Sequence, residues 1–291
     1  DVASYYMSNY TCEYCRALLE RAIEGGYNFL DGICGVDACA QMNRCMENIE
    51  LLKCVDKPNF FVTHADIPYK YTDYTLDDYV IQMQNRVLNT MHEKLGVDVS
   101  DAALRESVAR HNELCKVMTE ISEMRKLANP PITGYEFHII NMVSYVCPQK
   151  LILPYLQETL AEIKKRKPDP KPWYRCRVGI VGSEVDDPNL TRMLEEAGAF
   201  ICFDRFCFGM FPGREVIELN DEEPALRQIC RHYLITSECP RFMSNEKIEQ
   251  RRETADRLAR EYDADGIIYE NVKFCDFWGF ERALASHIQY E

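Results

Sequence analysis

Apolar residues recur along this chain at two spacings, one typical of helices and one typical of buried strands. Short apolar or alternating runs bounded by turn residues predict strands at residues 29–36, 59–65, 176–185, 200–207 and 265–272. Apolar stripes with three- and four-residue spacing predict helices at residues 11–25, 75–96, 100–127, 135–167, 188–199, 223–233 and 245–262. Strands that alternate with helices favour parallel sheets joined by right-handed crossovers. The pattern therefore predicts an α/β fold.

Single residues predict where several helices begin, end or break. Thr75 and Ser100 are predicted N-caps, because a hydroxyl can accept a hydrogen bond from a backbone N–H group of the first turn. Gly96 is predicted to end the first of the two long helices. Pro148 and Pro154 are expected to interrupt the helical region that follows.

The segment KRKPDPKPW, residues 165–173, is the strongest linker signal in the chain. Three prolines among charged residues fit neither a helix interior nor a central strand. We therefore predict two domains, a first α/β domain with a long helical extension at residues 1–170 and a second α/β domain at residues 171–291. The predicted fold class is α/β, with two Rossmann-like domains that have short parallel sheets and are joined by a long helical segment.

Composition and charge narrow the class of protein. The 291 residues are 46% hydrophobic and 28% charged, which is the balance of a globular chain. A net charge of -13 argues against nucleic acid or an anionic membrane surface as a partner, since both would repel the chain. No apolar run reaches the roughly 18 to 20 residues of a membrane span, and the start DVASYYMSNY lacks the features of a signal peptide. We expect a cytoplasmic protein, and the start at Asp1 rather than at a methionine indicates a processed or partial chain.

Fourteen cysteines are an enrichment for a chain of this length, but without a secretion signal they are better interpreted as thiols or metal ligands than as disulfides. Cys12 opens a predicted helix, whereas Cys39, Cys207 and Cys275 follow predicted strands. Thiolates at strand ends and helix starts can converge on a cleft between domains, where three or four of them suit an iron–sulfur cluster or zinc. Cys12 and Cys15 also have C-x-x-C spacing, which fits zinc, a redox dithiol or part of a cluster. The alternative for any single cysteine, Cys275 included, is a small buried hydrophobe.

Other features have ordinary structural interpretations. Gly179 and Gly182 end a strand before a helix, but the segment lacks a phosphate-binding fingerprint, so a tight turn is favoured. His64, His138 and His232 are scattered along the chain, which favours core or surface roles.

Asp204 and Arg205 either line a cleft between the domains or form a salt bridge. Cys15, Cys34 and Cys45 lie around the first-domain candidates. Buried, inert thiols are expected for the cysteines at Cys54, Cys115, Cys147, Cys176, Cys202 and Cys230.

Several motifs resemble one family, the 2-hydroxyacyl-CoA dehydratase and benzoyl-CoA reductase superfamily, which includes the 2-hydroxyglutaryl-CoA dehydratase D-component family. NYTCEYCRALLE resembles its first cysteine-bearing helix start, and LDGICGVDAC resembles its second cysteine segment. GSEVDDPNLTRMLEEAGAFICFDRFCFG, YLITSECPRF and DGIIYENVKFCDFWGFE are similar to its later motifs and occur in the same order. The last motif is the most specific, and the resemblance covers the chain from about residue 10 to the end.

The resemblance implies an oxygen-sensitive enzyme subunit in which Cys12, Cys39 and Cys275 hold a four-iron four-sulfur cluster between the domains. It implies a hydro-lyase, a 2-hydroxyacyl-CoA dehydratase, that forms a heterodimer with a second homologous subunit and receives one electron from an ATP-hydrolysing activator protein. One-electron reduction of the acyl-CoA to a ketyl radical would let the hydroxyl group leave and would acidify the β-proton. A low-potential cluster with an open iron position suits that chemistry.

The resemblance leaves alternatives. One is a benzoyl-CoA reductase-like enzyme or a reductase with a double-cubane cluster, and another is a noncatalytic partner subunit that only relays electrons. Members of the family have a further lobe before the first cysteine helix and a further segment after the last motif. Both ends of this chain are therefore expected to be incomplete relative to the family.

Overall fold

The computed structural model describes residues 2–168, 174–210 and 214–285 of the chain. Its elements group into two compact units, each built from segments that are far apart in the sequence. Unit 1 comprises Asp1–Arg105, Leu219–Thr236 and Val272–Gly279, and unit 2 comprises Glu106–Glu218, Ser237–Asn271 and Phe280–Glu291. The boundary near residue 170 stays a prediction, and residues 169–173 of the expected linker lie outside the described residues.

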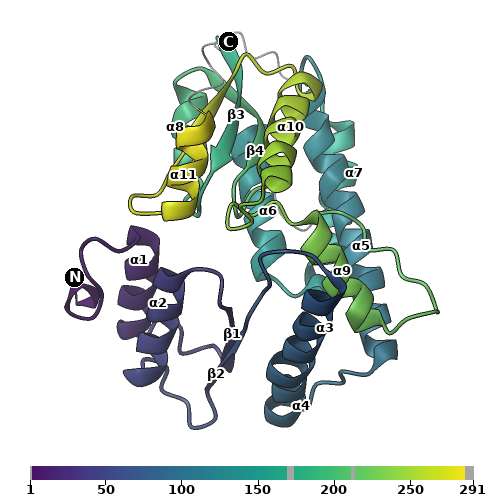
Figure 1. Ribbon diagram of the computed structural model, residues 1–291. Coiled ribbons are helices and arrows are strands. Elements are labelled where there is room, and N and C mark those ends of the chain that lie inside the picture. Colours follow the sequence, from purple (N-terminus) through teal and green to yellow (C-terminus); the bar gives the residue numbers. More distant parts are fainter. Residues whose placement is uncertain (1, 169–173, 211–213, 286–291) are drawn as a thin grey trace. The chain divides into compact units, whose positions relative to one another are not determined.

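Unit 1 contains a two-stranded parallel sheet between two helical layers. The sheet pairs β1 (Gly32–Val36) with β2 (Phe61–Ala65). Figure 1 shows these strands between the helix pair α1 (Glu13–Ile23) and α2 (Ala40–Leu51) on one side and a second helical layer on the other. The second layer contains α3 (Asp73–Gln82), the π-helical segment η2 (Met83–Leu88), α4 (Asn89–Leu95) and α9 (Ala225–Thr236), and a 3-10 turn, η1 (Ala3–Tyr5), precedes α1.

Buried apolar side chains fix the helices of unit 1 in place. The cluster that packs α1 against α2 consists of Ala3, Met7, Cys12, Cys15, Leu19, Ala22, Cys45 and Ile49. The cluster that packs α3 against α9 consists of Leu76, Tyr79, Leu226, Cys230 and Leu234. Complete burial of one leucine side chain contributes about 1.5 to 3 kcal/mol. The starts of α1 and α2 are therefore held at fixed positions by the core beneath them.

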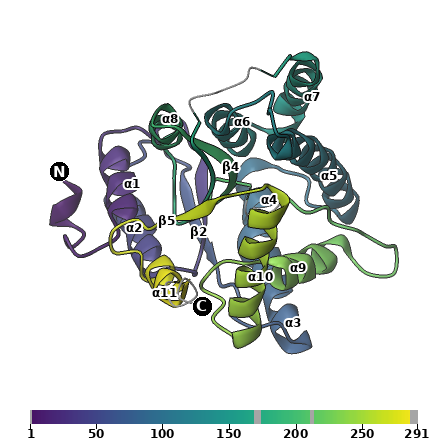
Figure 2. The ribbon, with the colours of Figure 1, turned by 90° about the horizontal axis from the view of Figure 1, so that it is seen from above.

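Unit 2 contains a three-stranded parallel sheet in the order β4-β3-β5. Its strands are β3 (Cys176–Gly182), β4 (Ala199–Arg205) and β5 (Gly266–Glu270). Figure 2 shows α6 (Gly134–Val146) and α8 (Asn189–Glu196) on one side of this sheet and α10 (Asn245–Glu261) on the other. The unit also contains η3 (Met124–Lys126) and α7 (Gln149–Lys165), and it shares with unit 1 the residues of α5 (Asp101–Glu123) and α11 (Asp276–Ala285).

The short parallel sheets confirm the predicted α/β class, whereas two Rossmann-like domains joined by a helical segment stay a prediction. The helices α2 and α11 were not predicted. Pro148 separates α6 from α7 as predicted, but the second predicted interruption is wrong, because α7 continues through Pro154. Leu156, Leu160 and Ile163 are buried along that helix, and their packing offsets the backbone hydrogen bond that the proline removes.

The predicted helix ends are confirmed in two cases and corrected in a third. Gly96 ends α4 in the left-handed conformation, with φ 67°. The Ser100 hydroxyl accepts a hydrogen bond of 3.3 Å from the N–H group of Ala103 at the start of α5. The cap of α3 is Thr72 and not Thr75. The two threonines form a capping box, in which each side chain accepts a hydrogen bond from the backbone N–H group of the other.

Gly179 and Gly182 allow close packing of strands and do not form the tight turn that the sequence favours. Both lie within β3. A Cβ atom at Gly182 would lie 2.1 Å from the carbonyl oxygen of Glu270 on β5, and one at Gly179 would lie 2.0 Å from the Phe203 ring on β4. Glycine at these positions is therefore required by the sheet of unit 2 itself.

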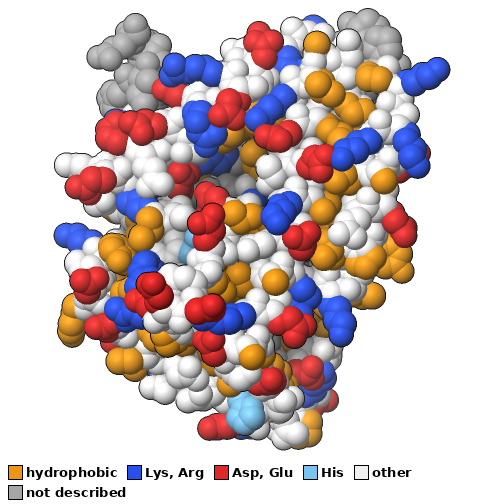
Figure 3. Space-filling view, turned by 90° about the vertical axis from the view of Figure 1, so that its right-hand side faces the viewer, with side chains coloured by type: hydrophobic (Ala, Val, Ile, Leu, Met, Phe, Trp, Pro, Cys, Tyr) orange, Lys and Arg blue, Asp and Glu red, His pale blue; other side chains and the backbone are white. Residues whose placement is uncertain are grey.

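Charged side chains of both signs are interspersed on the face shown in Figure 3, and neither sign gathers into one patch there. Among the described residues, no helix is both long enough and apolar enough to cross a bilayer.

Candidate functional site

The three cysteines that the family resemblance singles out each stand directly before a helix of unit 1 or of its last segment. Cys12 is the N-cap of α1, Cys39 is the N-cap of α2, and Cys275 immediately precedes α11. Only for Cys12 did the sequence predict this placement. The N-terminus of a helix carries partial positive charge, which favours a thiolate or another anion at that position.

The side chain of Gln41, in the first turn of α2, connects these segments. Its Oε1 accepts a hydrogen bond from the backbone N–H group of Cys12. Its Nε2 donates to the carbonyl oxygen of Phe274 at 3.0 Å and to Oδ2 of Asp276 at 3.1 Å. These two acceptors flank Cys275 on either side in the sequence. One amide therefore joins three parts of the chain that each carry one of the cysteines.

The segment before α11 makes further contacts with the start of α1. The backbone N–H group of Glu13 donates to the carbonyl oxygen of Lys273 at 3.4 Å. The rings of Tyr10 and Phe274 meet edge to face, with centroids 5.9 Å apart. Val272 packs against the core that holds α1 on α2. Residues 272–275 are thus part of the packing of unit 1.

Phe274 has φ 67°, a left-handed backbone conformation that is unfavourable for a bulky residue. Such strain costs on the order of 1 to 3 kcal/mol and persists only where the surrounding structure imposes it. The contacts of Phe274 with Gln41 and Tyr10 supply that constraint. The strained residue directly precedes Cys275, so it determines how that thiol enters α11.

The thiols of this region influence each other's ionisation. The neighbouring Cys15 thiol lowers the pKa of the Cys12 thiol to about 6, with the backbone N–H groups of Cys15 and Tyr14 acting in the same direction against burial. The same hydrogen bond, together with burial, raises the pKa of Cys15 far above its usual value. Burial raises the pKa of Cys275 to about 11, and the charges of Cys12 and Cys39 add to that rise. Cys12, Cys39 and Cys275 therefore lie near enough to interact electrostatically.

The donor set has the chemistry of an iron–sulfur ligand set, since it consists of three soft thiols at helix N-termini. Within residues 2–168, 174–210 and 214–285, no group of three or more His, Cys, Asp or Glu side chains is close enough to hold a single metal ion. A cluster offers a separate iron atom to each thiolate, so its ligands stand further apart than the ligands of one ion do. The arrangement fits a cluster better than it fits a mononuclear zinc site.

The remaining cysteines fall into three groups. Cys15 and Cys45 are buried in the core of unit 1, whereas Cys34 is exposed. Burial raises the pKa of the three fully buried thiols that were expected to be inert, to about 11 or 12, at Cys115, Cys202 and Cys230. The half-buried thiols are Cys54, Cys147, Cys176, Cys207 and Cys239. Cys207, a sequence candidate for the same site, belongs to unit 2.

The charged and histidine candidates of unit 2 have structural roles. Asp204 and Arg125 form a completely buried ion pair of 2.8 Å, and Arg205 pairs with Glu238. The salt-bridge interpretation of Asp204 and Arg205 is therefore the correct one. His138 is fully buried, with hydrogen bonds to Thr191 and to the carbonyl oxygen of Val185.

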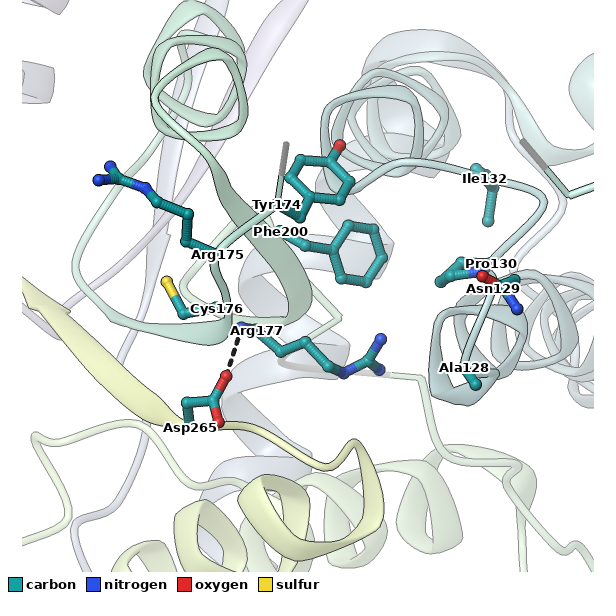
Figure 4. Close-up of a pocket in the computed structure, with 10 residues that line it drawn as sticks. All are labelled: Ala128, Asn129, Pro130, Ile132, Tyr174, Arg175, Cys176, Arg177, Phe200 and Asp265. Carbon is teal, nitrogen blue, oxygen red and sulfur yellow. Dashed lines mark hydrogen bonds between the residues drawn. The ribbon is translucent and has the colours of Figure 1, made fainter. Parts of the chain in front are cut away.

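A cavity of about 270 Å³ in unit 2 lies at the amino ends of the strands (Figure 4). Its central cation, Arg177, donates to the carbonyl oxygens of Arg125 and Tyr262 at 2.7 and 2.8 Å. The carboxylate of Asp265 accepts a hydrogen bond of 2.8 Å from the N–H group of Arg177. Because these groups are used by the fold, and because ligands of parallel sheets collect at the carboxyl ends, this cavity is not the candidate site.

Taken together, these features define an α/β protein with a thiol-rich site assembled in unit 1. The model of the family described as "2-hydroxyglutaryl-CoA dehydratase, D-component" matches residues 1–288, and the chain belongs to this family. The family resemblance inferred from the cysteine motifs is confirmed.

Two curated relatives match almost the whole chain. The chain is 23% identical over 287 residues to one of the named subunits of benzoyl-CoA reductase from Thauera aromatica, which covers 97% of this chain and 71% of the relative. It is 24% identical over 282 residues to the beta subunit of (R)-phenyllactyl-CoA dehydratase from Clostridium sporogenes, which covers 94% of this chain and 70% of the relative. Both relatives are named as subunits, and their names describe acyl-CoA chemistry.

Proposed function

We propose that this chain is the iron–sulfur subunit of a 2-hydroxyacyl-CoA dehydratase-like enzyme, a hydro-lyase. Cys12, Cys39 and Cys275 hold a four-iron four-sulfur cluster in this proposal. The observation that carries it is the convergence in unit 1 of three thiols from opposite ends of the chain, near enough for the charges of Cys12 and Cys39 to raise the pKa of Cys275. Membership of the dehydratase family supports the choice of reaction.

The residues of the chain would bind the cluster, shield it and balance its charge. Three thiolates give it three protein ligands, and a bound cluster of this kind supplies a low-potential electron and an iron position that no cysteine occupies. The starts of α1, α2 and α11 offset the negative charge of the thiolates. Cys12 is only 7% exposed, so its side of the site excludes water.

The reaction that we propose is elimination of water from a 2-hydroxyacyl-CoA after one-electron reduction, with the electron delivered by a separate ATP-hydrolysing activator protein. A second homologous subunit would complete a heterodimer. The subunit designations of both relatives support a partner subunit.

Two alternatives keep specific support. A benzoyl-CoA reductase-like reaction is supported by the relative from Thauera aromatica, whose identity to this chain is close to that of the dehydratase subunit. A double-cubane reductase would draw on extra thiols, and Cys15 and Cys45 lie next to the proposed ligands. A noncatalytic subunit that relays electrons would use the same three ligands without contacting substrate.

Anaerobic purification with iron and acid-labile sulfide counts tests the ligand set. The wild-type chain should hold about four irons and about four sulfides, and serine at Cys12, Cys39 or Cys275 should abolish that content. The matched control is Cys34→Ser, which removes an exposed thiol of the same unit and should leave the counts unchanged. A wild-type chain without iron, or full content in any of the three ligand variants, contradicts the proposal. About eight irons per chain would favour the double cubane.

The reaction is tested with the complete enzyme, its activator and ATP under anaerobic conditions. Loss of water from a 2-hydroxyacyl-CoA supports the dehydratase, whereas ring reduction of an aromatic acyl-CoA supports the reductase. If added acyl-CoA leaves the electron paramagnetic resonance spectrum of this chain's cluster unchanged, the relay role is favoured.

A further inference from the structure

We infer that Gln41 is a positioning residue that sets the relative placement of the three cysteine segments around the proposed cluster. This inference rests on the proposed function and extends it to a residue that is not a ligand. Gln41 contacts the residue Cys12 through its backbone, stands two residues after Cys39, and binds both neighbours of Cys275.

The three hydrogen bonds use the amide in one orientation only. A glutamine amide has two N–H donors and one carbonyl acceptor. Here both donors are used, by the Phe274 carbonyl oxygen and the Asp276 carboxylate, and the acceptor takes the N–H group of Cys12. In the reversed orientation the amide oxygen would face two other oxygens and the amide nitrogen would face a donor. The network therefore specifies both the residue type and its rotamer.

Residues of similar size cannot replace these contacts. Glutamate could still accept from the Cys12 N–H group, but it could not donate to the Phe274 carbonyl oxygen and would repel Asp276. Methionine has a similar length without any strong donor or acceptor. Glutamine alone satisfies the backbone on one side and the carboxylate on the other.

Gln41 also has a rigid support and a strained target. It belongs to α2, whose Cys45 and Ile49 are fixed in the core of unit 1. Its bond to Phe274 is one of the contacts that hold the left-handed backbone before Cys275. Residues that orient metal ligands in this way change metal affinity about 10- to 100-fold when they are lost.

The test compares Gln41→Met and Gln41→Glu with Gln84→Ala in the full-length chain, loaded anaerobically. The control removes a glutamine of unit 1 whose amide bonds Asn89 within the same helical region. We expect a ferrous-iron chelator to strip the cluster about 10- to 100-fold faster from both Gln41 variants than from the wild type. The spectrum of the reduced cluster should shift in both variants, and the control should match the wild type in rate and spectrum.

A second measurement uses the iron-free chain and separates this inference from the proposed function. In Gln41→Glu the link to Cys12 persists while the links around Cys275 are lost, so alkylation of Cys275 should speed up at least about fivefold relative to Cys12. Wild-type chain that binds no iron refutes the proposed function, yet the alkylation ratio still tests the role of Gln41. Wild-type release rates and spectra in the loaded Gln41→Met and Gln41→Glu chains, together with an unchanged alkylation ratio, overturn the inference.

Discussion

Nε2 of Gln41 lies 3.0 Å from the carbonyl oxygen of Phe274, although 233 residues separate the two in the sequence. This contact places the last motif of the chain in the same compact unit as the first two cysteine segments. Unit 1 is therefore completed by residues from the far end of the chain. The following predictions test the packing and electrostatics that surround this arrangement and the core of unit 2.

Replacement of Phe274 should separate backbone strain from ring packing. Phe274→Ala and Phe274→Gly both lose the edge-to-face contact with Tyr10, but only glycine adopts φ 67° without penalty. The glycine variant should be more stable than the alanine variant by about 1 to 2 kcal/mol. Urea unfolding of the iron-free chain measures the difference. Equal stabilities would mean that the left-handed backbone at this position relaxes in solution.

The buried pair of Asp204 and Arg125 should be costly to break. Asp204→Asn leaves the guanidinium of Arg125 buried without its counter-charge and should lower the free energy of unfolding by about 3 to 5 kcal/mol. The double variant Arg125→Met/Asp204→Leu removes both charges and should be more stable than Asp204→Asn. Guanidinium unfolding provides the values.

The control for that pair is the exposed pair of Arg192 and Glu196, with a separation of 3.4 Å. Glu196→Gln should change the free energy of unfolding by less than about 1 kcal/mol, because solvent screens exposed charges. A loss at Asp204 as small as the loss at Glu196 would contradict the burial of the first pair.

His138 should make stability depend on pH below neutrality. Burial lowers the pKa of this imidazole in the folded chain, with Arg125 acting in the same direction and Asp204 opposing. In the unfolded chain the group binds a proton near pH 6.5, at about its ordinary pKa. The contribution of His138 is thus present above that pH and is lost as the pH falls toward the lower folded pKa. The wild type should lose stability between pH 7 and pH 5 more steeply than His138→Gln, as followed by urea unfolding, and parallel curves would refute the assignment.

Alkylation rates should distinguish the exposed thiol from the buried ones. Cys34 is exposed, whereas Cys202 is completely buried and burial raises its pKa to about 11. Iodoacetamide should modify Cys34 about tenfold faster or more than Cys202 in the folded chain, since only an accessible thiolate reacts. Peptide mass spectrometry reports both sites in one sample. In denaturant the two rates should become similar, and comparable rates in the folded chain would contradict the burial of Cys202.

Local patterns predicted most of the regular elements and missed two that bear on the site. The strands found in the structure all lie within predicted strands or begin one residue earlier, because apolar runs bounded by turn residues are a strong signal. The helix α2 was missed because polar residues dominate its first turns, although Cys45, Met46 and Ile49 form a buried stripe at helical spacing. That stripe was the signal that could have located it and, with it, the helix start at Cys39.

The role of Gln41 and the backbone of Phe274 could not be predicted from local patterns. The hydrogen bonds of Gln41 join positions that only the folded chain brings together, so no spacing in the sequence encodes them. The left-handed conformation of Phe274 contradicts the preference of aromatic residues and is imposed by its tertiary contacts. The convergence of Cys12, Cys39 and Cys275 was expected from the family resemblance, and their role as ligands stays a prediction.

Because Val272–Gly279 belongs to unit 1, the order of protein synthesis matters for this site. The first two cysteines leave the ribosome long before the third, so they wait for nearly the whole chain to be translated. Contacts over such sequence distances also form slowly. Insertion of the inorganic core is therefore expected to follow release of the polypeptide, and a nascent chain halted before residue 272 would expose two of the thiols without being able to retain iron.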